Sequence, residues 1–395
     1  MKQLSIFIFV IACFASCKKA LIEHTQSTTP GMPWEDTSSL HPKNEQFKEL
    51  LEKYRKKGFP GISLLVNDVN GTWMGSTGKA DIEKNIDFEP ATVSKAASIT
   101  KLLVGTLVFK LIEDSANTGI GYGFLNTKIN QWLPHSITDK LANGNIVTVG
   151  QCMKHETGIP DVIEQDAFYL AVLNNPNKIW QPEEILEYVY NKPAVFYPSD
   201  TAIYSNTNTT IVAMAIEAAT GKKHDELLKQ YVTEPLNMTN TFYQPHDALP
   251  SYTAQGYFDL YNNNTIVNVS NLITGSGNGY GGIFSNVFDL YKFIDALLIK
   301  QTVLTTRSLT IMQTWGKPDG LNEYGYGIMK KFIDRGIDAG IGHSGRDLGY
   351  TANLFYFPNK HLTHVFFINY GTDADSNLKE VFNEFQEELL DLTLQ

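Results

Sequence analysis

The feature that most constrains this chain is a helix-forming stretch that is apolar on nearly every side. It starts at Ser98, and its apolar members are Ile99, Leu102, Leu103, Val104, Leu107, Val108, Leu111 and Ile112. A helix without a polar face has to lie inside a protein, covered all round. The chain has 395 residues, of which 43% are hydrophobic and 19% charged. That is enough to bury such a helix within one large domain.

Patterns typical of β-strands lie towards both ends of the chain. Residues 61–66 predict a buried strand, and Asn70-Gly71 predicts a hairpin turn into residues 72–77. Late strands are expected over 350–357 and 364–370, followed by an amphipathic terminal helix. We therefore expect an α+β fold, an antiparallel sheet flanked by helices. The sheet part would span about 45–105 and 275–395, with a large, mainly helical insertion over about 106–274.

The first residues have the pattern of an export signal. Lys2 is positive, residues 4–16 are mostly apolar, and Cys17 follows. That apolar stretch is too short to span a bilayer, which takes ~20 residues. Residues 14–17 (Phe-Ala-Ser-Cys) resemble a bacterial lipobox, so we expect a lipoprotein of the cell envelope, lipidated at Cys17; plain secretion is the alternative. Residues 18–44, rich in Thr, Ser and Pro, predict a flexible tether to a catalytic body over 45–395.

Charge and cysteine content exclude some classes of function. The formal net charge of -10 argues against nucleic acid as a partner, since phosphates require a basic face. Besides Cys13 inside the signal, the cysteines are Cys17 and Cys152. With Cys17 acylated, no disulfide can form within the chain, and we expect Cys152 to be a small buried residue.

The first candidate for chemistry is Ser98-Ile99-Thr100-Lys101. Three residues along a helix bring two side chains onto one face, so Lys101 can lie against the Ser98 hydroxyl. A buried lysine favours its neutral form and can accept the serine proton. The S-x-x-K pattern also occurs at Ser16, Ser76 and Ser376, but only Ser98 begins an apolar helix. On its own the pattern equally fits a serine helix cap followed by a surface lysine.

Two further segments carry reactive side chains. In Tyr204-Ser205-Asn206, a phenol can shuttle a proton when nearby cations lower its pKa, and the Asn206 amide can bind a substrate amide. A solvated turn is the alternative there. In His343-Ser344-Gly345, the glycine allows close backbone approach at a strand edge, and the hydroxyl can hold a substrate carboxylate. The backbone N–H of Arg346, with that of Ser98, could form an oxyanion hole. A strand with a half-buried histidine is the alternative.

Taken in order, these three motifs resemble those of the serine β-lactamase and D-Ala-D-Ala carboxypeptidase superfamily. Residues 155–161 (HETGIPD) are similar to its H-T-S-G-L-P-D segment, and the similarity covers about residues 45–395. The chain departs from the pattern at Glu156, where Thr is usual, at Ser199, where Gly is usual, and at His343, where β-lactamases carry Lys.

The resemblance implies a β-lactamase/transpeptidase-like fold and a role for each motif. Ser98 would be the nucleophile, Lys101 its base, and Tyr204 a second acid or base. Asn206, His343, Ser344, Gly345 and Arg346 would contact substrate. Lys330, Lys331 or the Arg346 side chain would supply the cation that binds a substrate carboxylate, and the sequence does not choose among them.

The expected activity is that of a serine hydrolase acting through a covalent acyl-enzyme on an amide or ester substrate. Because H-S-G is similar to the H-T-G of one carboxypeptidase branch, a D-Ala-D-Ala carboxypeptidase-like peptidase is preferred. An esterase of the same fold, a β-lactamase and a non-catalytic binding protein are the alternatives. The chemistry needs no cofactor and no metal. The oligomeric state stays open.

Overall fold

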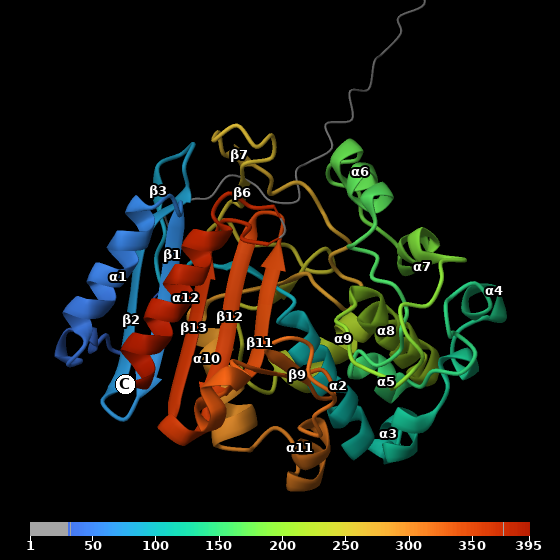
Figure 1. Cartoon of the computed structure of the whole chain (residues 1–395). Coiled ribbons are helices and arrows are strands. Elements are labelled where there is room, and N and C mark those ends of the chain that lie inside the picture. Colours follow the sequence, from blue (N-terminus) through green and yellow to red (C-terminus); the bar gives the residue numbers. More distant parts are fainter. Residues whose placement is uncertain (1–30, 32, 374) are drawn as a thin grey trace, which may run out of the picture.

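The computed structural model describes residues 31, 33–373 and 375–395 (Figure 1). The predicted signal, Cys17 and residues 18–30 of the predicted tether lie outside the described residues. Among the residues that are described, no helix is both long and apolar enough to cross a membrane.

The centre of the molecule is an antiparallel sheet. Within the described part of the chain its strand order is β3-β2-β1-β13-β12-β11-β10-β9. In chain order these strands are β1 (Gly61–Asp68), β2 (Gly71–Asp81), β3 (Ile86–Asp87), β9 (Asn322–Tyr324), β10 (Met329–Lys331), β11 (Gly340–Asp347), β12 (Tyr350–Phe357) and β13 (Leu362–Ile368). Strand β1 pairs with β13, with Ile62 opposite Ile368. The early and late strand patterns therefore belong to one sheet, as predicted.

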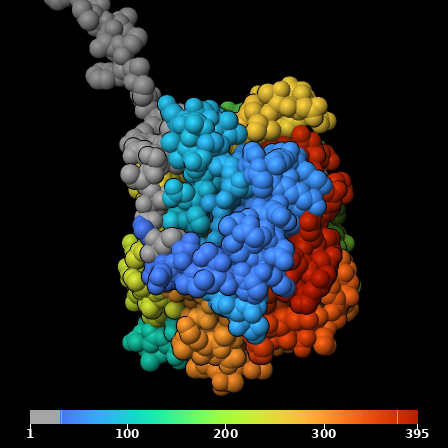
Figure 2. Space-filling view, turned by 90° about the vertical axis from the view of Figure 1, so that its left-hand side faces the viewer, coloured from blue at the N-terminus to red at the C-terminus, as the bar shows by residue number. Residues whose placement is uncertain are grey.

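Helices cover both faces of the sheet. Successive side chains of a strand point to opposite faces, so one strand contributes apolar side chains to both layers. Ile62 and Leu64 of β1 pack in a cluster with α1 (Asn44–Lys56) and α12 (Lys379–Leu394). Leu65 belongs instead to the cluster on the other face, with α2 (Thr100–Glu113) and α10 (Val287–Ile294). Figure 1 shows α1 and α12 in front of the sheet and α10 behind it. Figure 2 looks at the edge where the N-terminal residues, in blue, pack beside the C-terminal residues, in red.

The apolar helix is buried as the sequence predicts. All residues of α2 from Thr100 to Phe109 are buried. The helix begins at Thr100 rather than at Ser98, which lies in the turn that follows strand β4 (Ser94–Ala97). A small second sheet joins β4 to β8 (Ile283–Ser285) and β5 (Phe242–Tyr243).

Between β4 and β8 the chain is mainly helical and lies beside the sheet (Figure 1). The helices there are α3 (Ser115–Thr118), α4 (His135–Thr138), α5 (Val149–Met153), α6 (Asp166–Asn174), α7 (Pro182–Leu186), α8 (Asn206–Thr220) and α9 (His224–Leu228). Strands β6 (Tyr257–Phe258) and β7 (Val267–Asn268) form a small hairpin, and α11 (Thr306–Met312) precedes β9. Single turns of 3-10 or π helix are η1 (Ser38–Leu40), η2 (Tyr122–Asn126), η3 (Ile129–Gln131), η4 (Glu187–Val189), η5 (Lys229–Thr233), η6 (Asp295–Ile299), η7 (Ile333–Asp338) and η8 (Pro358–Lys360).

Candidate active site

Ser98 occupies a sharp turn between β4 and α2. The preceding Ala97 has a φ of 48°, in the left-handed region, which costs of order 1–3 kcal/mol for a non-glycine residue. The turn is closed by the Lys101 N–H, which donates to the Ser98 carbonyl at 3.0 Å. This geometry brings Ser98 to the wall of a cleft of about 780 Å³.

The cleft lies where the sheet meets the helical part. Strand β11 contributes Ser344, Arg346 and Asp347, and the segment leading into α8 contributes Tyr204 and Asn206. The predicted motifs at Ser98, Tyr204 and Ser344 are therefore brought together, although more than a hundred residues separate each from the next.

The Lys101 amine is buried against Ser98. Its side chain is 1% exposed, and Nζ lies 3.1 Å from Ser98 Oγ, 2.7 Å from Asn206 Oδ1 and 2.9 Å from the Tyr280 carbonyl oxygen. The last two atoms can only accept hydrogen bonds. A neutral amine has two N–H groups and one lone pair. With both N–H groups donated to these acceptors, the lone pair points at Ser98.

The electrostatics favour this neutral form near neutral pH. Burial lowers the pKa of Lys101 to about 7, although the nearby carboxylates of Asp161 and Asp347 act in the opposite direction. A lysine with such a pKa can take a proton from Ser98 and return it within one catalytic cycle.

Tyr204 forms the aromatic side of the site. Its ring centroid lies 4.6 Å from that of His155 and 6.2 Å from that of His343, and Lys101 Nζ lies 4.8 Å from the ring. The expectation that cations lower the pKa of Tyr204 is wrong. Burial raises that pKa well above its usual value, and a hydrogen bond with Ser98 only partly opposes this. The phenol therefore keeps its proton, so the protonated form is the one present in the site.

Asn206, the first residue of α8, connects the lysine to a buried carboxylate. Its Oδ1 accepts from Lys101, and its Nδ2 donates to Asp161 Oδ2 at 2.8 Å. Burial raises the pKa of Asp161, and hydrogen bonds from Ile163 and Asn206 act against that rise. Asn206 lines the cleft as predicted, but here the amide also fixes the position of Lys101.

Strand β11 closes the site opposite α2. Its Gly345 lies so close to β4 that a Cβ there would sit 1.9 Å from the Ala96 carbonyl oxygen and 3.1 Å from the Ser98 nitrogen. This close approach is what the glycine was predicted to allow. His343 is 2% exposed, and burial lowers its pKa to about 3, so its imidazole is neutral. Ser344 lines the cleft.

The three candidate cations are placed differently. Lys330 and Lys331 are neighbours on β10, where successive side chains face opposite ways, and Arg346 lies on β11. Lys331 lines the cleft and its amine bonds Gln386 Oε1 at 3.4 Å. Lys330 is not among the described residues that line the cleft, and its amine pairs with Glu323 at 2.9 Å. Arg346 lines the cleft too, with its guanidinium 3.4 Å from Asp373. Lys331 and Arg346 thus line the cleft, and a substrate contact of Lys330 stays a prediction.

Several groups of the site were not foreseen. Asp161 ends the HETGIPD segment, which was noted for its pattern but given no role. Lys95, three residues before Ser98, forms a buried ion pair with Asp347 at 2.5 Å. The sequence feature that could have indicated this pair is a lysine among small residues just before Ser98. Tyr280 acts through its backbone carbonyl, for which no side-chain pattern exists.

Comparison with known proteins agrees with this geometry. A sequence profile of the β-lactamase family matches residues 47–385. The chain belongs to the β-lactamase family. This family, which includes the penicillin-binding proteins, consists of serine acyl-transfer enzymes. The predicted membership of this superfamily is thereby confirmed, as is the predicted mixed fold of antiparallel sheet and helices.

Individual β-lactamase-family members are distant in sequence. The chain is 24% identical over 258 residues to the D-alanyl-D-alanine-carboxypeptidase/endopeptidase AmpH of Escherichia coli K12, a match covering 65% of this chain and 62% of AmpH. The D-amino acid amidase of Ochrobactrum anthropi SV3 superposes with a TM-score of 0.74 at 21% identity, covering 88% of this chain and 98% of that chain. A penicillin binding protein of Bacillus halodurans gives a TM-score of 0.70 at 21% identity, covering 86% and 98%. The chain spans less than two thirds of the length of the curated relatives it matches.

One departure from the β-lactamase-family pattern has a visible consequence. Ser199, where glycine is usual, has a φ of 66°, a left-handed conformation that glycine adopts without steric cost. The Ser199 hydroxyl accepts a hydrogen bond from Gln151 Nε2 at 2.9 Å.

Proposed function

We propose that this chain hydrolyses amide bonds through an acyl-enzyme on Ser98. The observation that carries the proposal is the arrangement around Lys101, a buried amine that lies 3.1 Å from Ser98 Oγ and has Asn206 Oδ1 and the Tyr280 carbonyl oxygen as its other two partners. Burying a lysine costs free energy, and buried ionisable groups on the wall of a cleft are typical of catalytic sites.

Acylation would proceed in two steps. Lys101 accepts the Ser98 proton as Oγ bonds to the substrate carbonyl carbon, and negative charge develops on the carbonyl oxygen. Tyr204 then donates its proton to the leaving nitrogen as the C–N bond breaks, and it regains a proton from Lys101. The products are a free amine and an ester of Ser98. Water attacks this ester by the reverse proton route and releases the acid.

The test is acylation of the intact protein. Incubation with a β-lactam or an activated D-alanyl ester is expected to add the acyl mass to the wild-type chain and not to Ser98→Ala. Ser76→Ala is the matched control, because Ser76 begins another S-x-x-K sequence on strand β2 and should leave acylation unchanged. Acylation that persists in Ser98→Ala would remove Ser98 from the mechanism.

For the substrate, a D-Ala-D-Ala carboxypeptidase remains our prediction from the H-S-G motif. The carboxypeptidase name of AmpH supports it. Such an enzyme has to bind the terminal carboxylate of its substrate, and Lys331 or Arg346 is the group available on the cleft wall.

A second candidate is an amidase for substrates that carry a positive charge. The described residues that line the cleft include six acids and two bases, which are Asp161, Glu164, Asp166, Asp347, Asp373, Asp375, Lys331 and Arg346. Glu164, Asp166 and Asp375 have no ion-pair partner in the described part of the chain. An excess of carboxylates attracts cations and repels carboxylates. The fold shared with a D-amino acid amidase is compatible with this candidate.

One pair of substrates separates the candidates. A D-alanyl-D-alanine peptide and its C-terminal amide differ only in the terminal carboxylate. Faster hydrolysis of the free acid supports the carboxypeptidase, and faster hydrolysis of the amide, with further gain from a free amino group, supports the amidase. Turnover of short-chain esters alone would indicate an esterase, and rapid turnover of the β-lactam a β-lactamase.

We further propose export and lipidation at Cys17, on the sequence pattern alone. Labelled palmitate should be incorporated into the wild-type chain in bacterial cells and not into Cys17→Ser. Secretion without the label would support the alternative of plain export.

A further inference from the structure

The loop that supplies the Tyr280 carbonyl to Lys101 is rich in glycine. Gly275, Gly277, Gly279 and Gly282 all have positive φ. Glycine gives a chain its greatest conformational freedom, so this loop needs support from outside to hold a carbonyl at a fixed place. A shift of about 1 Å in a catalytic contact can cost as much as 100-fold in rate.

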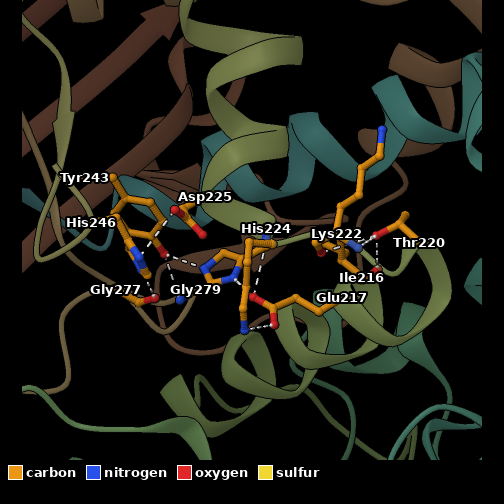
Figure 3. Close-up of polar contacts among 11 residues, drawn as sticks. Ile216, Glu217, Thr220, Lys222, His224, Asp225, Tyr243, His246, Gly277 and Gly279 are labelled. Atoms are coloured by element: carbon orange, nitrogen blue, oxygen red, sulfur yellow. Dashed lines mark hydrogen bonds and ion pairs between the residues drawn. The ribbon is translucent and has the colours of Figure 1, made fainter.

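Such support comes from a cluster of polar side chains that contact the loop (Figure 3). His224 Nδ1 lies 2.7 Å from Glu217 Oε1, and His224 Nε2 lies 3.1 Å from the Tyr243 hydroxyl. The Tyr243 oxygen accepts the Gly279 N–H at 2.9 Å. Gly279 immediately precedes Tyr280. The chain of contacts therefore runs from α8, through the first residue of α9, to the backbone next to the carbonyl that Lys101 uses.

The donors and acceptors of this chain fit one assignment for a neutral imidazole. The Glu217 carboxylate can only accept, so Nδ1 of His224 carries the hydrogen. Nε2 is then an acceptor, and the Tyr243 O–H donates to it. The Tyr243 oxygen remains free to accept from Gly279. His224 and Tyr243 are 5% and 3% exposed, so water competes little for these bonds.

A second contact holds the same loop two residues earlier. His246 Nε2 lies 3.0 Å from the Gly277 carbonyl oxygen, and His246 Nδ1 lies 3.3 Å from Asp225 Oδ2. Figure 3 shows the two histidines approaching the loop together.

The same cluster offers ligand atoms of Glu217, His224 and Asp225 within 4.8 Å of one another, a spacing that a cation could use. Both ring nitrogens of His224 already have partners, however, and the Glu217 carboxylate also binds Lys223 at 2.8 Å. Hydrogen bonding accounts for these contacts without an ion.

We propose that Glu217, His224 and Tyr243 are positioning residues, which hold the Tyr280 carbonyl where it directs the Lys101 lone pair at Ser98. The proposal rests on the proposed function in one respect, that Lys101 is the base. None of the three is among the described residues that line the cleft, so each acts through the loop rather than on substrate.

The test is Tyr243→Phe, which removes the hydroxyl and keeps the ring. We expect kcat for acylation to fall about tenfold while KM changes less than twofold, because substrate contacts are untouched. Tyr252→Phe is the matched control. It also removes one tyrosine hydroxyl, which bonds Asn240 Oδ1 at 2.9 Å, and it should leave kcat unchanged. Glu217→Gln, whose amide oxygen can still accept from His224, should stay close to the wild type, whereas Glu217→Ala should resemble Tyr243→Phe.

A second readout is the protonation of Lys101 itself, followed by NMR with lysine labelled at Cε and assigned with Lys101→Ala. Asp161, Asp347, Tyr204 and His343 stay in place around the amine in every variant. A carbonyl oxygen stabilises the ammonium form, so its displacement in Tyr243→Phe should move the Lys101 titration to lower pH, and Tyr252→Phe should not.

The outcomes separate the two proposals. An unchanged Lys101 titration in folded Tyr243→Phe overturns the positioning role, whatever the enzyme's activity. A shifted titration, together with full acylation by Lys101→Ala, supports the positioning role and rejects Lys101 as the base. Acylation that is lost to EDTA and restored by Zn²⁺ would replace the hydrogen-bond explanation by a metal site.

Discussion

At the scale of single residues, the proposed function depends on how many hydrogen-bond acceptors surround the Lys101 amine. Asn206 Oδ1 and the Tyr280 carbonyl occupy the two N–H groups that a neutral Lys101 has. Replacing either acceptor by a donor would turn the lone pair away from Ser98. The chemistry proposed for the site therefore depends on the positions of these two acceptors as much as on the lysine itself.

The pKa of Lys101 predicts the pH dependence of acylation. The ammonium form has no lone pair, so kcat/KM should fall about tenfold for each pH unit below about 7 and should be flat above it, where the amine is neutral. Steady-state rates between pH 5 and pH 9 measure this. A rate that still rises about tenfold per pH unit up to pH 9, as the usual lysine pKa of about 10.4 would give, would contradict a buried, neutral Lys101.

Asp161→Asn should move that acidic limb. The Asp161 carboxylate raises the pKa of Lys101, so its removal lowers this pKa and shifts the limb to lower pH. Asp166→Asn is the control: Asp166 also lines the cleft, but it is not among the charges that act on Lys101. Equal shifts in both variants would mean that the general field of the cleft, rather than Asp161, sets the protonation of Lys101.

At the scale of elements, the site depends on the approach of β11 to β4. Only a residue without a side chain fits at Gly345, since a Cβ would lie 1.9 Å from the Ala96 oxygen. Strand β4 carries Ala96 and leads directly into Ser98, so any separation of the strands displaces the nucleophile.

Gly345→Ala should therefore reduce acylation by more than about 100-fold. Gly342→Ala is the comparison, because a Cβ there would lie 1.9 Å from the Leu354 oxygen, on the side of β12. Both variants should lose thermal stability, but Gly342→Ala should retain more of the acylation rate. Similar losses of rate in the two variants would show that strand packing in general, and not the contact at β4, is responsible.

At the scale of the whole molecule, the first and last strands of the large sheet pair with each other near its centre. β1 and β13 are neighbours, and α1 and α12 cover them together. Phe385 of α12 is fully buried among Tyr54, Phe59 and Phe366. Stability of the sheet that holds β11 therefore depends on the terminal helix.

Phe385→Ala should lower the free energy of unfolding by about 3–5 kcal/mol, the usual cost of removing a buried phenylalanine. Leu40→Ala, at a side chain 81% exposed, should change it by less than about 0.5 kcal/mol. Urea unfolding followed by circular dichroism measures both. A small effect of Phe385→Ala would mean that α12 contributes little to the sheet.

The sequence by itself determined the elements and the reactive groups. An apolar helix, early and late strands and an amphipathic terminal helix are local patterns of burial, and each formed close to the predicted residues, although the apolar helix begins at Thr100 rather than at Ser98. The candidate residues Ser98, Lys101 and Tyr204 were also evident, because the serine and the lysine are three residues apart and the motifs follow a family order.

Only the tertiary structure decided how those groups act. The direction of the Tyr204 pKa shift, the choice of Lys331 over Lys330 at the cleft, and the roles of Asp161 and the Tyr280 carbonyl depend on burial and on contacts between distant segments. Asn206 reaches Lys101 across 105 positions of the chain, and Tyr280 across 179. Desolvation and hydrogen-bond geometry are properties of the folded surroundings, which no local pattern of side chains encodes.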